Sequence, residues 1–206
     1  MIQLYTAGTG NGRRATIMLE ECKLAYKAHI IEIGKGANKP AEFLKINPHG
    51  TVPVIVDPPG IGRKTATTVK QSGAILFYLA EKAGKFVPKA AAARALTVQW
   101  TMAALTDLAP ASTSIFLSTA VMPTKVPAVV GFFESRFIEQ CKVFDERLGE
   151  ADYLAGDEAT IADFALYPVI FGRQALVDKA PGLQNLKRWA ATMAARPATA
   201  AALKVA

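Results

Sequence analysis

The sequence predicts an α/β domain followed by an all-α domain. Two observations support this fold class: strand and helix signals alternate over residues 1–84, and strand signals disappear from residue 90 onward. Residues 84–89 read as a linker. A chain of 206 residues, 51% of them hydrophobic, can hold one large domain or two small ones. We expect two, at residues 1–84 and 90–206, because an α/β half followed by a helical half fits two domains better than one mixed sheet.

The elements of the first domain follow from periodicity and turn signals. Apolar residues recur at helical spacing after residue 14, and polar and apolar residues alternate after Tyr26. β-branched residues at 52–56 indicate a strand, and Asp-Pro-Pro-Gly at 57–60 is a strong turn signal. The expected elements are a strand at 2–6, a turn at 9–12, a helix at 14–24, a strand at 26–33, a loop at 34–39, a short helix at 41–46, a strand after Pro53, a returning strand at 65–69 and a helix capped by Ser72 that runs to about residue 83. This order is a thioredoxin-like arrangement.

The second domain shows helix signals only. Pro110, Pro123 and Pro127 break up its first half, because proline lacks the amide hydrogen that a helix interior needs. Thr160 and Asp163 form a capping box at a helix start, and removing the cap should cost about 1 kcal/mol of stability. The expected helices span residues 90–106, 126–148, 160–176 and 183–194.

Composition excludes several functional classes. The formal net charge is +7, but the basic residues are spread along the chain without interleaved aromatic residues, so no nucleic-acid partner is indicated. His29 and His49 are the only histidines, and Cys22 and Cys141 lack metal-ligand spacing, so we expect no metal. We find neither a secretory signal nor 18 uninterrupted apolar residues. We therefore expect a cytoplasmic protein without membrane contact, whose cysteines are buried apolar residues.

Residues 9–12 (TGNG) form a turn that leads into a helix. A helix N-terminus gathers unpaired backbone N–H groups and the positive end of the helix dipole, here beside Thr9 and Asn11. Such an environment favours a thiolate. Lowering a thiol pKa by about two units requires roughly 2.7 kcal/mol of preferential stabilisation of the anion. The alternative, from spacing alone, is a turn that binds no ligand.

Pro53 stands at the head of a β-branched run, where it has no amide hydrogen to give to a sheet. An X–Pro bond can be cis. A cis bond here would turn the backbone of Val52 outward, free to hydrogen-bond a peptide-like ligand as an added strand would. The alternative is an ordinary entry into an edge strand.

Four motifs, taken in order, resemble the glutathione transferase superfamily. Residues 47–53 match N-P-x-G-x-V-P, residues 71–75 match E/Q-S-x-A-I, and residues 156–163 match G-x-x-x-T/S-x-A-D. The turn at 9–12 is similar to the T-P-N-G loop of the bacterial nu-class and yeast prion-like branch, which includes disulfide-bond oxidoreductases, with Gly10 in place of the proline. The resemblance covers nearly the whole chain. It implies a thioredoxin-like domain that binds glutathione and a helical domain that forms the second-substrate pocket.

The resemblance also implies the residues of the site. Many classes of the family activate the glutathione thiol with Tyr, Ser or Cys in the first turn, and this chain has none there. The implied residues are Thr9 and Asn11 as hydrogen-bond donors to the glutathione sulfur, Val52 and Pro53 along its backbone, Gln71 and Ser72 at its γ-glutamyl end, and Asn38 at its glycyl end. Taken without the resemblance, Ser72 is an ordinary helix cap and Asn38 belongs to a solvated loop. An arginine that relatives place in the long helix cannot be assigned to Arg136, and the neighbouring Phe132 and Phe133 either line an apolar second-substrate pocket or belong to the core.

The function that the resemblance implies is that of a glutathione transferase. The thiolate of glutathione, as co-substrate, would attack an apolar electrophile or a small disulfide. We also expect a homodimer with a role in detoxification, as is usual in the family. Two alternatives stay open: a glutathione-dependent disulfide reductase without conjugation activity, which needs no protein cysteine, and a non-catalytic binding module that keeps the fold. The neutral Gln71 and the unassigned arginine are consistent with the last of these.

Overall fold

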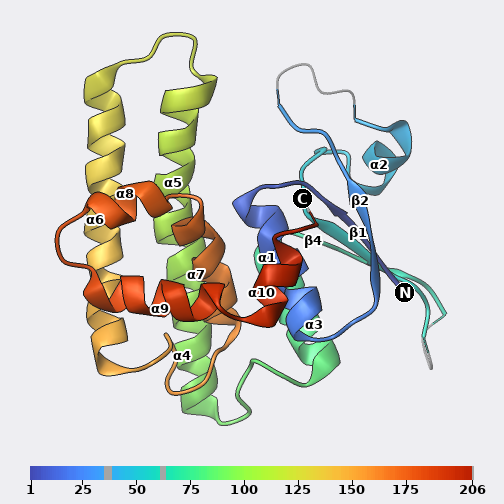
Figure 1. The fold of residues 1–206 in the computed structure, drawn as a ribbon. Coiled ribbons are helices and arrows are strands. Elements are labelled where there is room, and N and C mark those ends of the chain that lie inside the picture. The colour runs from blue at the N-terminus through green and yellow to red at the C-terminus, as the bar shows by residue number, and fades with distance from the viewer. Residues whose placement is uncertain (35–38, 61–63, 206) are drawn as a thin grey trace. The chain divides into compact units, whose positions relative to one another are not determined.

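The structure, a computed structural model, describes residues 1–34, 39–60 and 64–205. The chain divides into two compact units: unit 1 is Met1–Val87 together with Ala195–Ala206, and unit 2 is Pro88–Ala194. Figure 1 shows a sheet with helices in unit 1 and helices in unit 2. The predicted fold class is therefore confirmed, although the sequence had placed residues 195–206 with the helical domain. Within the described residues, no helix has both the length and the apolar character needed to cross a membrane.

Unit 1 is built on a four-stranded mixed sheet with the strand order β2-β1-β3-β4. β1 pairs in parallel with β2 and antiparallel with β3, and β3 pairs antiparallel with β4. This is the predicted thioredoxin-like arrangement. The elements of unit 1 are β1 (Ile2–Thr6), α1 (Gly10–Glu21), β2 (Tyr26–Ile30), α2 (Ala41–Ile46), β3 (Val54–Asp57), β4 (Thr67–Lys70), α3 (Ser72–Ala83) and α10 (Pro197–Ala202).

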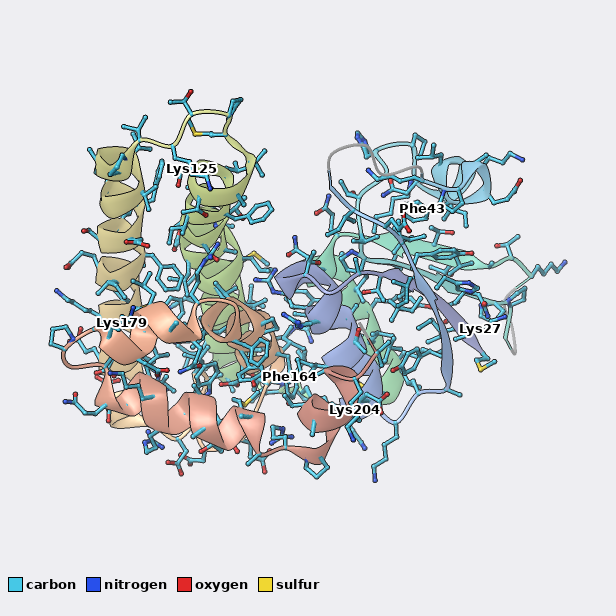
Figure 2. All side chains as sticks on the ribbon, turned by 45° about the horizontal axis from the view of Figure 1, so that its top comes forward. Lys27, Phe43, Lys125, Phe164, Lys179 and Lys204 are labelled. Carbon is cyan, nitrogen blue, oxygen red and sulfur yellow. The ribbon has the colours of Figure 1, made fainter. Side chains whose placement is uncertain are left out.

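The alternation of side chains along β1 divides the core of unit 1 between the two faces of the sheet. Leu4 and its partner Ile55 are fully buried on one face. Tyr5 and its partner Val54 lie on the other face, where both pack against Phe43 of α2. Figure 2 labels Phe43 beside the sheet. α1 packs against both α3 and α10, which ties the last helix of the chain to unit 1.

Several boundaries in unit 1 differ from those predicted. α1 begins at Gly10 rather than residue 14, because the hydroxyl of Thr9 accepts a hydrogen bond from the backbone N–H of Gly12 and caps the helix there. β2 ends before the predicted residue 33, and β4 begins after the predicted residue 65. The prediction that Ser72 caps its helix is wrong. Gln71 is the residue that precedes α3, and Ser72 is already helical.

Unit 2 consists of eight successive helical segments, all of which lie in its described residues. They are α4 (Ala91–Met102), the π-helical η1 (Ala103–Leu108), α5 (Ala109–Phe116), the π-helical η2 (Leu117–Val121), α6 (Pro127–Glu150), α7 (Ile161–Phe171), α8 (Gln174–Lys179) and α9 (Gln184–Ala194). The predicted break near Pro110 is wrong, because the chain stays helical from α4 to the end of η2. Pro110 lies in the first turn of α5, where a missing N–H is tolerated, and the π-helical η1 precedes it. The predicted helix at 160–176 is two helices, α7 and α8.

α7 is the most buried helix of unit 2, and Figure 2 labels its Phe164. It packs against α4 and α9. The predicted capping box is confirmed at its start, where the backbone N–H of Thr160 donates to Oδ2 of Asp163 at 2.9 Å. Asp163 also accepts a hydrogen bond from Nε1 of Trp189 on α9, at 2.9 Å. The same carboxylate therefore caps α7 and fixes α9.

Candidate functional site

One end of the sheet in unit 1 carries the predicted site residues that the structure describes. Tyr5 of β1 pairs with Val54 of β3, and Val54 pairs with Lys70 of β4. These are the last pairs of the two ladders at this end. The segments that continue from them therefore leave the sheet side by side. They are the turn at residues 7–12, residues 52–53 and residues 71–72.

The turn after β1 presents the N-terminus of α1. Thr9 has an extended backbone, with φ of −101° and ψ of 161°, and its hydroxyl accepts the N–H of Gly12 at 3.0 Å. A hydroxyl that accepts one hydrogen bond can still donate another. Position 12 requires glycine, because a Cβ there would lie 2.1 Å from the carbonyl oxygen of Ala7. This close approach holds the turn against the end of β1.

The side chain of Asn11 is exposed, and Arg14 and Ser72 hold it in place. Nη1 of Arg14 donates to Oδ1 of Asn11 at 2.5 Å and to Oγ of Ser72 at 3.3 Å. The hydroxyl of Ser72 in turn donates to Oδ1 of Asn11 at 3.3 Å. Because a guanidinium can only donate, the amide oxygen of Asn11 faces Arg14 and the amide nitrogen faces away from it. The first turn of α1 therefore offers an oriented N–H donor.

Arg14 is a site residue that the sequence analysis missed. Its side chain is 2% exposed, and burial lowers the pKa of the guanidinium to about 10, so the group remains a cation at neutral pH. The sequence did contain one signal that Arg14 lies near Asn11. Arg14 follows Asn11 by three positions, and residues three apart lie on the same face of a helix. The burial of a charged side chain, however, cannot be read from local spacing.

The peptide bond between Val52 and Pro53 is cis, the geometry that the motif at 47–53 suggests. Pro53 is buried and Val52 is half-buried. The side chain of Val52 packs against the cluster of Ile31, Phe43 and Val54. The ladder between β1 and β3 ends at Val54, so Val52 lies beyond it. Its side chain is thus anchored in the core, while its backbone precedes the paired part of β3.

Gln71 has a backbone conformation that non-glycine residues rarely adopt. Its φ is 70° and its ψ is 122°, and its side chain is exposed. Such a conformation costs on the order of 1–3 kcal/mol and persists where the surrounding structure enforces it. Here it allows β4 to turn directly into α3, so that Ser72 begins the helix next to Asn11.

The structure joins some of the predicted residues directly. Asn11 and Ser72 are hydrogen-bonded to each other, although the sequence separates them by 61 positions. Thr9 caps the helix that carries Asn11, and Gln71 precedes Ser72. Asn38 lies outside the described residues. The roles of all these residues toward a ligand remain predictions.

The two cysteines do not belong to this site. Cys22 and Cys141 are both buried free thiols. Burial raises the pKa of Cys22 to about 11 and that of Cys141 to about 12. Thiols of such high pKa are almost fully protonated at neutral pH, so neither is a ready nucleophile. No group of three His, Cys, Asp or Glu side chains in the described parts of the chain is arranged to hold a metal ion.

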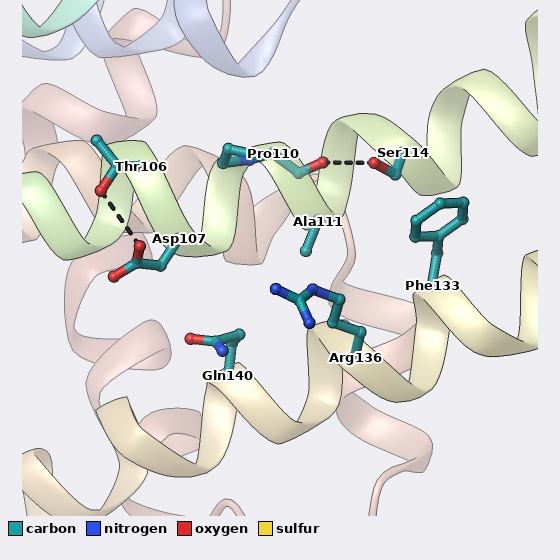
Figure 3. A pocket seen from close by; sticks show the side chains of 8 residues that line it. All are labelled: Thr106, Asp107, Pro110, Ala111, Ser114, Phe133, Arg136 and Gln140. Carbon is teal, nitrogen blue, oxygen red and sulfur yellow. Dashed lines mark hydrogen bonds between the residues drawn. The ribbon is translucent and has the colours of Figure 1, made fainter.

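Unit 2 contains a pocket of about 280 Å³ between the η1–α5 segment and α6 (Figure 3). Its lining residues are Thr106, Asp107, Pro110, Ala111, Ser114, Phe133, Arg136 and Gln140. Most of these side chains are polar or charged. Arg136, which the sequence could not assign, lines this pocket together with Phe133. Phe132 is 62% exposed and touches Phe133 edge-on, so this aromatic pair is not part of the buried core.

Comparison with known proteins identifies the family. Residues 11–82 match the glutathione S-transferase N-terminal domain, and residues 133–197 match the glutathione S-transferase C-terminal domain. The disulfide-bond oxidoreductase YfcG of Escherichia coli (strain K12) is 34% identical to this chain. That match covers 98% of this chain and 94% of YfcG.

Solved structures lead to the same family. A glutathione transferase family member from Pseudomonas fluorescens pf-5, with two glutathione bound, superposes with a TM-score of 0.86 at 32% identity, covering 98% of this chain and 92% of that one. A glutathione transferase from Pseudomonas putida, with one glutathione disulfide bound per subunit, superposes with a TM-score of 0.86 at 29% identity. The match covers 98% of this chain and 90% of that chain. The chain thus belongs to the glutathione transferase superfamily, in the branch that contains the bacterial disulfide-bond oxidoreductases.

Proposed function

We propose that this protein binds glutathione at the described end of the unit 1 sheet and holds its thiol as a thiolate. The observation that carries the proposal is the oriented amide of Asn11, which is exposed at the N-terminus of α1. An N–H donor and the positive end of a helix dipole both favour an anionic sulfur. The hydroxyl of Thr9 supplies a second donor. Both side chains act as hydrogen-bond donors, and neither acts as a base.

The rest of glutathione is bound by the segments that meet at the same end of the sheet. Val52 and Pro53 precede β3, where a peptide backbone can align as an added strand does. The N-terminus of α3 with Ser72 receives the γ-glutamyl carboxylate, because helix N-termini favour anions. Gln71 offers a neutral oxygen to the α-ammonium group. Asn38 is proposed for the glycyl end from the resemblance alone.

The reaction that the site supports best is reduction of a disulfide by glutathione. The glutathione thiolate attacks one sulfur of the substrate, which forms a mixed disulfide and releases the other substrate sulfur as a thiolate that takes up a proton. A second glutathione loses its proton and attacks the glutathione sulfur of the mixed disulfide. The products are glutathione disulfide and the second substrate thiol, and the two glutathione protons end on the two product thiols. Because Cys22 and Cys141 are buried and protonated, glutathione supplies the nucleophile in both steps.

Three observations favour a disulfide over an apolar electrophile. YfcG is a disulfide-bond oxidoreductase by name. One similar structure holds two glutathione molecules, and another holds glutathione disulfide. The pocket of unit 2 is lined mainly by polar side chains, which suit a polar peptide-like disulfide better than an apolar compound.

Two other functions remain candidates. Conjugation of glutathione to an apolar electrophile is the second candidate, favoured by the Phe133 ring in the pocket of unit 2. A non-catalytic binding module is the third, favoured by the neutral Gln71. Binding of glutathione without turnover of either substrate would favour the third.

Calorimetry with millimolar glutathione tests the proposed binding, and parallel turnover of a small disulfide and of a chlorinated nitrobenzene tests the chemistry. We expect binding, turnover of the disulfide, and at least tenfold slower turnover in Asn11→Ala, since a hydrogen bond to a charged group contributes about 1.5–3 kcal/mol. Asn185→Ala, which removes a half-buried asparagine of unit 2, is the matched control and should keep full activity. Absence of glutathione binding would rule out the proposal. Turnover of the nitrobenzene alone would favour the second candidate.

We also propose that the protein is a cytoplasmic homodimer. Two buried free thiols suit a reducing compartment. Exposed apolar side chains on unit 2, among them Phe116, Val121 and Phe132, offer a surface for self-association. Light scattering in solution should give twice the 22.0 kDa mass of the chain. A role in detoxification follows only if turnover of apolar electrophiles is observed.

A further inference from the structure

Arg14 connects the N-terminal turns of two helices in unit 1. It lies on α1, and its Nη1 donates to Asn11 in the first turn of the same helix and to Ser72 in the first turn of α3. Because the Ser72 hydroxyl also donates to the Asn11 oxygen, the three side chains form a closed hydrogen-bonded triangle. The guanidinium is 2% exposed, whereas Asn11 is exposed, so the triangle has a buried side and a solvent side.

We propose that Arg14 is a positioning residue that fixes which end of the Asn11 amide faces the glutathione sulfur. This inference rests on the proposed glutathione site. An exposed asparagine can exchange its oxygen and nitrogen by a half-turn about its broad terminal torsion. The oxygen would repel a thiolate, and only the N–H₂ end can donate to it. Arg14 removes this ambiguity, because its buried guanidinium can only donate, and only the oxygen end of the amide can accept that hydrogen bond.

The bond from Arg14 to Ser72 extends this role to the other end of the ligand. Ser72 is the residue proposed to bind the γ-glutamyl carboxylate, and its hydroxyl shares Nη1 of Arg14 with Asn11. One buried side chain thus contacts both the Asn11 amide and Ser72, the first residue of the helix whose backbone N–H groups are proposed to receive the γ-glutamyl carboxylate. A change at Arg14 should therefore alter the sulfur environment and not only the stability of the fold.

The thiol pKa of bound glutathione, followed by the ultraviolet absorbance of the thiolate, measures this role directly. In Arg14→Met, the thiol pKa of bound glutathione should rise by about one unit, which corresponds to a tenfold change in the acid dissociation constant of the thiol. Arg14→Lys keeps a buried cationic donor and should reverse most of that rise. Lys23→Met, which removes a charge at an exposed position just after the end of α1, is the control and should leave the thiol pKa unchanged. Thermal unfolding of each variant identifies any that fail to fold.

Asn11→Asp tests the need for the amide N–H donor without any change at Arg14. The aspartate keeps an oxygen for the guanidinium, so the fold should be retained, but it has no N–H to give to the sulfur. We expect the thiol pKa of bound glutathione to rise by at least about one unit in this variant, because the N–H donor is lost and a carboxylate lies beside the sulfur. A low thiol pKa retained in Asn11→Asp, or in a folded Arg14→Met, would overturn the inference while leaving the proposed function intact. Failure of the unchanged protein to bind glutathione would instead reject the proposed function.

Discussion

Glu21 at the end of α1 forms a two-point ion pair with Arg196, the residue that precedes α10. Nε of Arg196 donates to Oε1 of Glu21 at 2.5 Å, and Nη2 donates to Oε2 at 2.8 Å. The Glu21 side chain is only 8% exposed, so solvent screens the pair weakly. The planar guanidinium matches both carboxylate oxygens, which adds geometric specificity to the charge interaction. This pair secures the last helix of the chain to the first helix of unit 1.

Loss of this ion pair should destabilise unit 1. Arg196→Met keeps the length of the side chain but leaves a mostly buried carboxylate without its cation, and we expect the free energy of unfolding to fall by about 2–3 kcal/mol. Urea unfolding measures the change. Lys204→Met, an exposed position at the other end of α10, is the control and should change stability by less than about 0.5 kcal/mol. Equal losses in the two variants would show that the pair is not what holds α10.

Gln71 combines backbone strain with a proposed binding role, and two substitutions separate them. Gln71→Gly should raise the free energy of unfolding by up to about 1 kcal/mol, because glycine adopts the positive φ without the cost that glutamine bears. Gln71→Ala keeps the strain and should give no such gain. Both variants lose the side-chain amide, so calorimetry should show weaker glutathione binding in each. Unchanged affinity in both would remove Gln71 from the proposed site.

The sequence predicted most of unit 1 because its signals are local. Alternation in the strands and the turn at 57–60 fixed the order of the elements, which the sheet confirms. The start of α1 was misplaced because the Asn-Gly pair in residues 9–12 reads as a turn, whereas the cap from Thr9 to Gly12 extends the helix through it. Ser72 was misread as a cap because no local signal reveals the unusual backbone of Gln71.

The features that the sequence did not predict depend on contacts between distant residues. The continuity of the helix across Pro110 relies on a π-helical segment, and helical periodicity does not reveal such a segment. The contact between Arg14 and Ser72 spans 58 positions. Asn11 was therefore predicted as a donor from the resemblance, but the buried arginine that orients it could only be found in the folded chain.

Asp163 should contribute more to stability than the capping box alone. Thr160→Ala removes one cap and should cost about 1 kcal/mol. Asp163→Ala leaves the buried N–H groups of Thr160, Leu154 and Trp189 without their acceptor, and we expect a loss of about 4 kcal/mol. Urea unfolding gives both values. The indole of Trp189 loses its partner only in the second variant, so only that variant should shift the tryptophan fluorescence. Similar losses in the two variants would limit the role of Asp163 to the cap.

The two buried thiols should make stability decline at alkaline pH. The pKa of Cys22 is raised to about 11 and that of Cys141 to about 12, whereas an unfolded cysteine titrates near 8.5. Between these values the unfolded chain has lost protons that the folded chain retains, so the free energy of unfolding must fall as the pH rises. The stabilisation that the protonated thiols provide is fully present below about pH 8.5. Above that pH, the free energy of unfolding falls with a slope that approaches about 1.4 kcal/mol per pH unit for each thiol.

The double variant Cys22→Ala/Cys141→Ala isolates this effect from other alkaline titrations. Its free energy of unfolding, measured by urea at intervals from pH 8 to pH 10.5, should fall less steeply than that of the unchanged protein. The two thiols lie in different units, so their effects on the slope should add. Each single variant should therefore remove about half of the difference in slope between the unchanged protein and the double variant. The lost packing volume lowers the stability of the variants by the same amount at every pH, so only the slope against pH reports the ionisation of the thiols. Parallel curves would mean that both thiols ionise as readily in the folded chain as in the unfolded one, which their burial opposes.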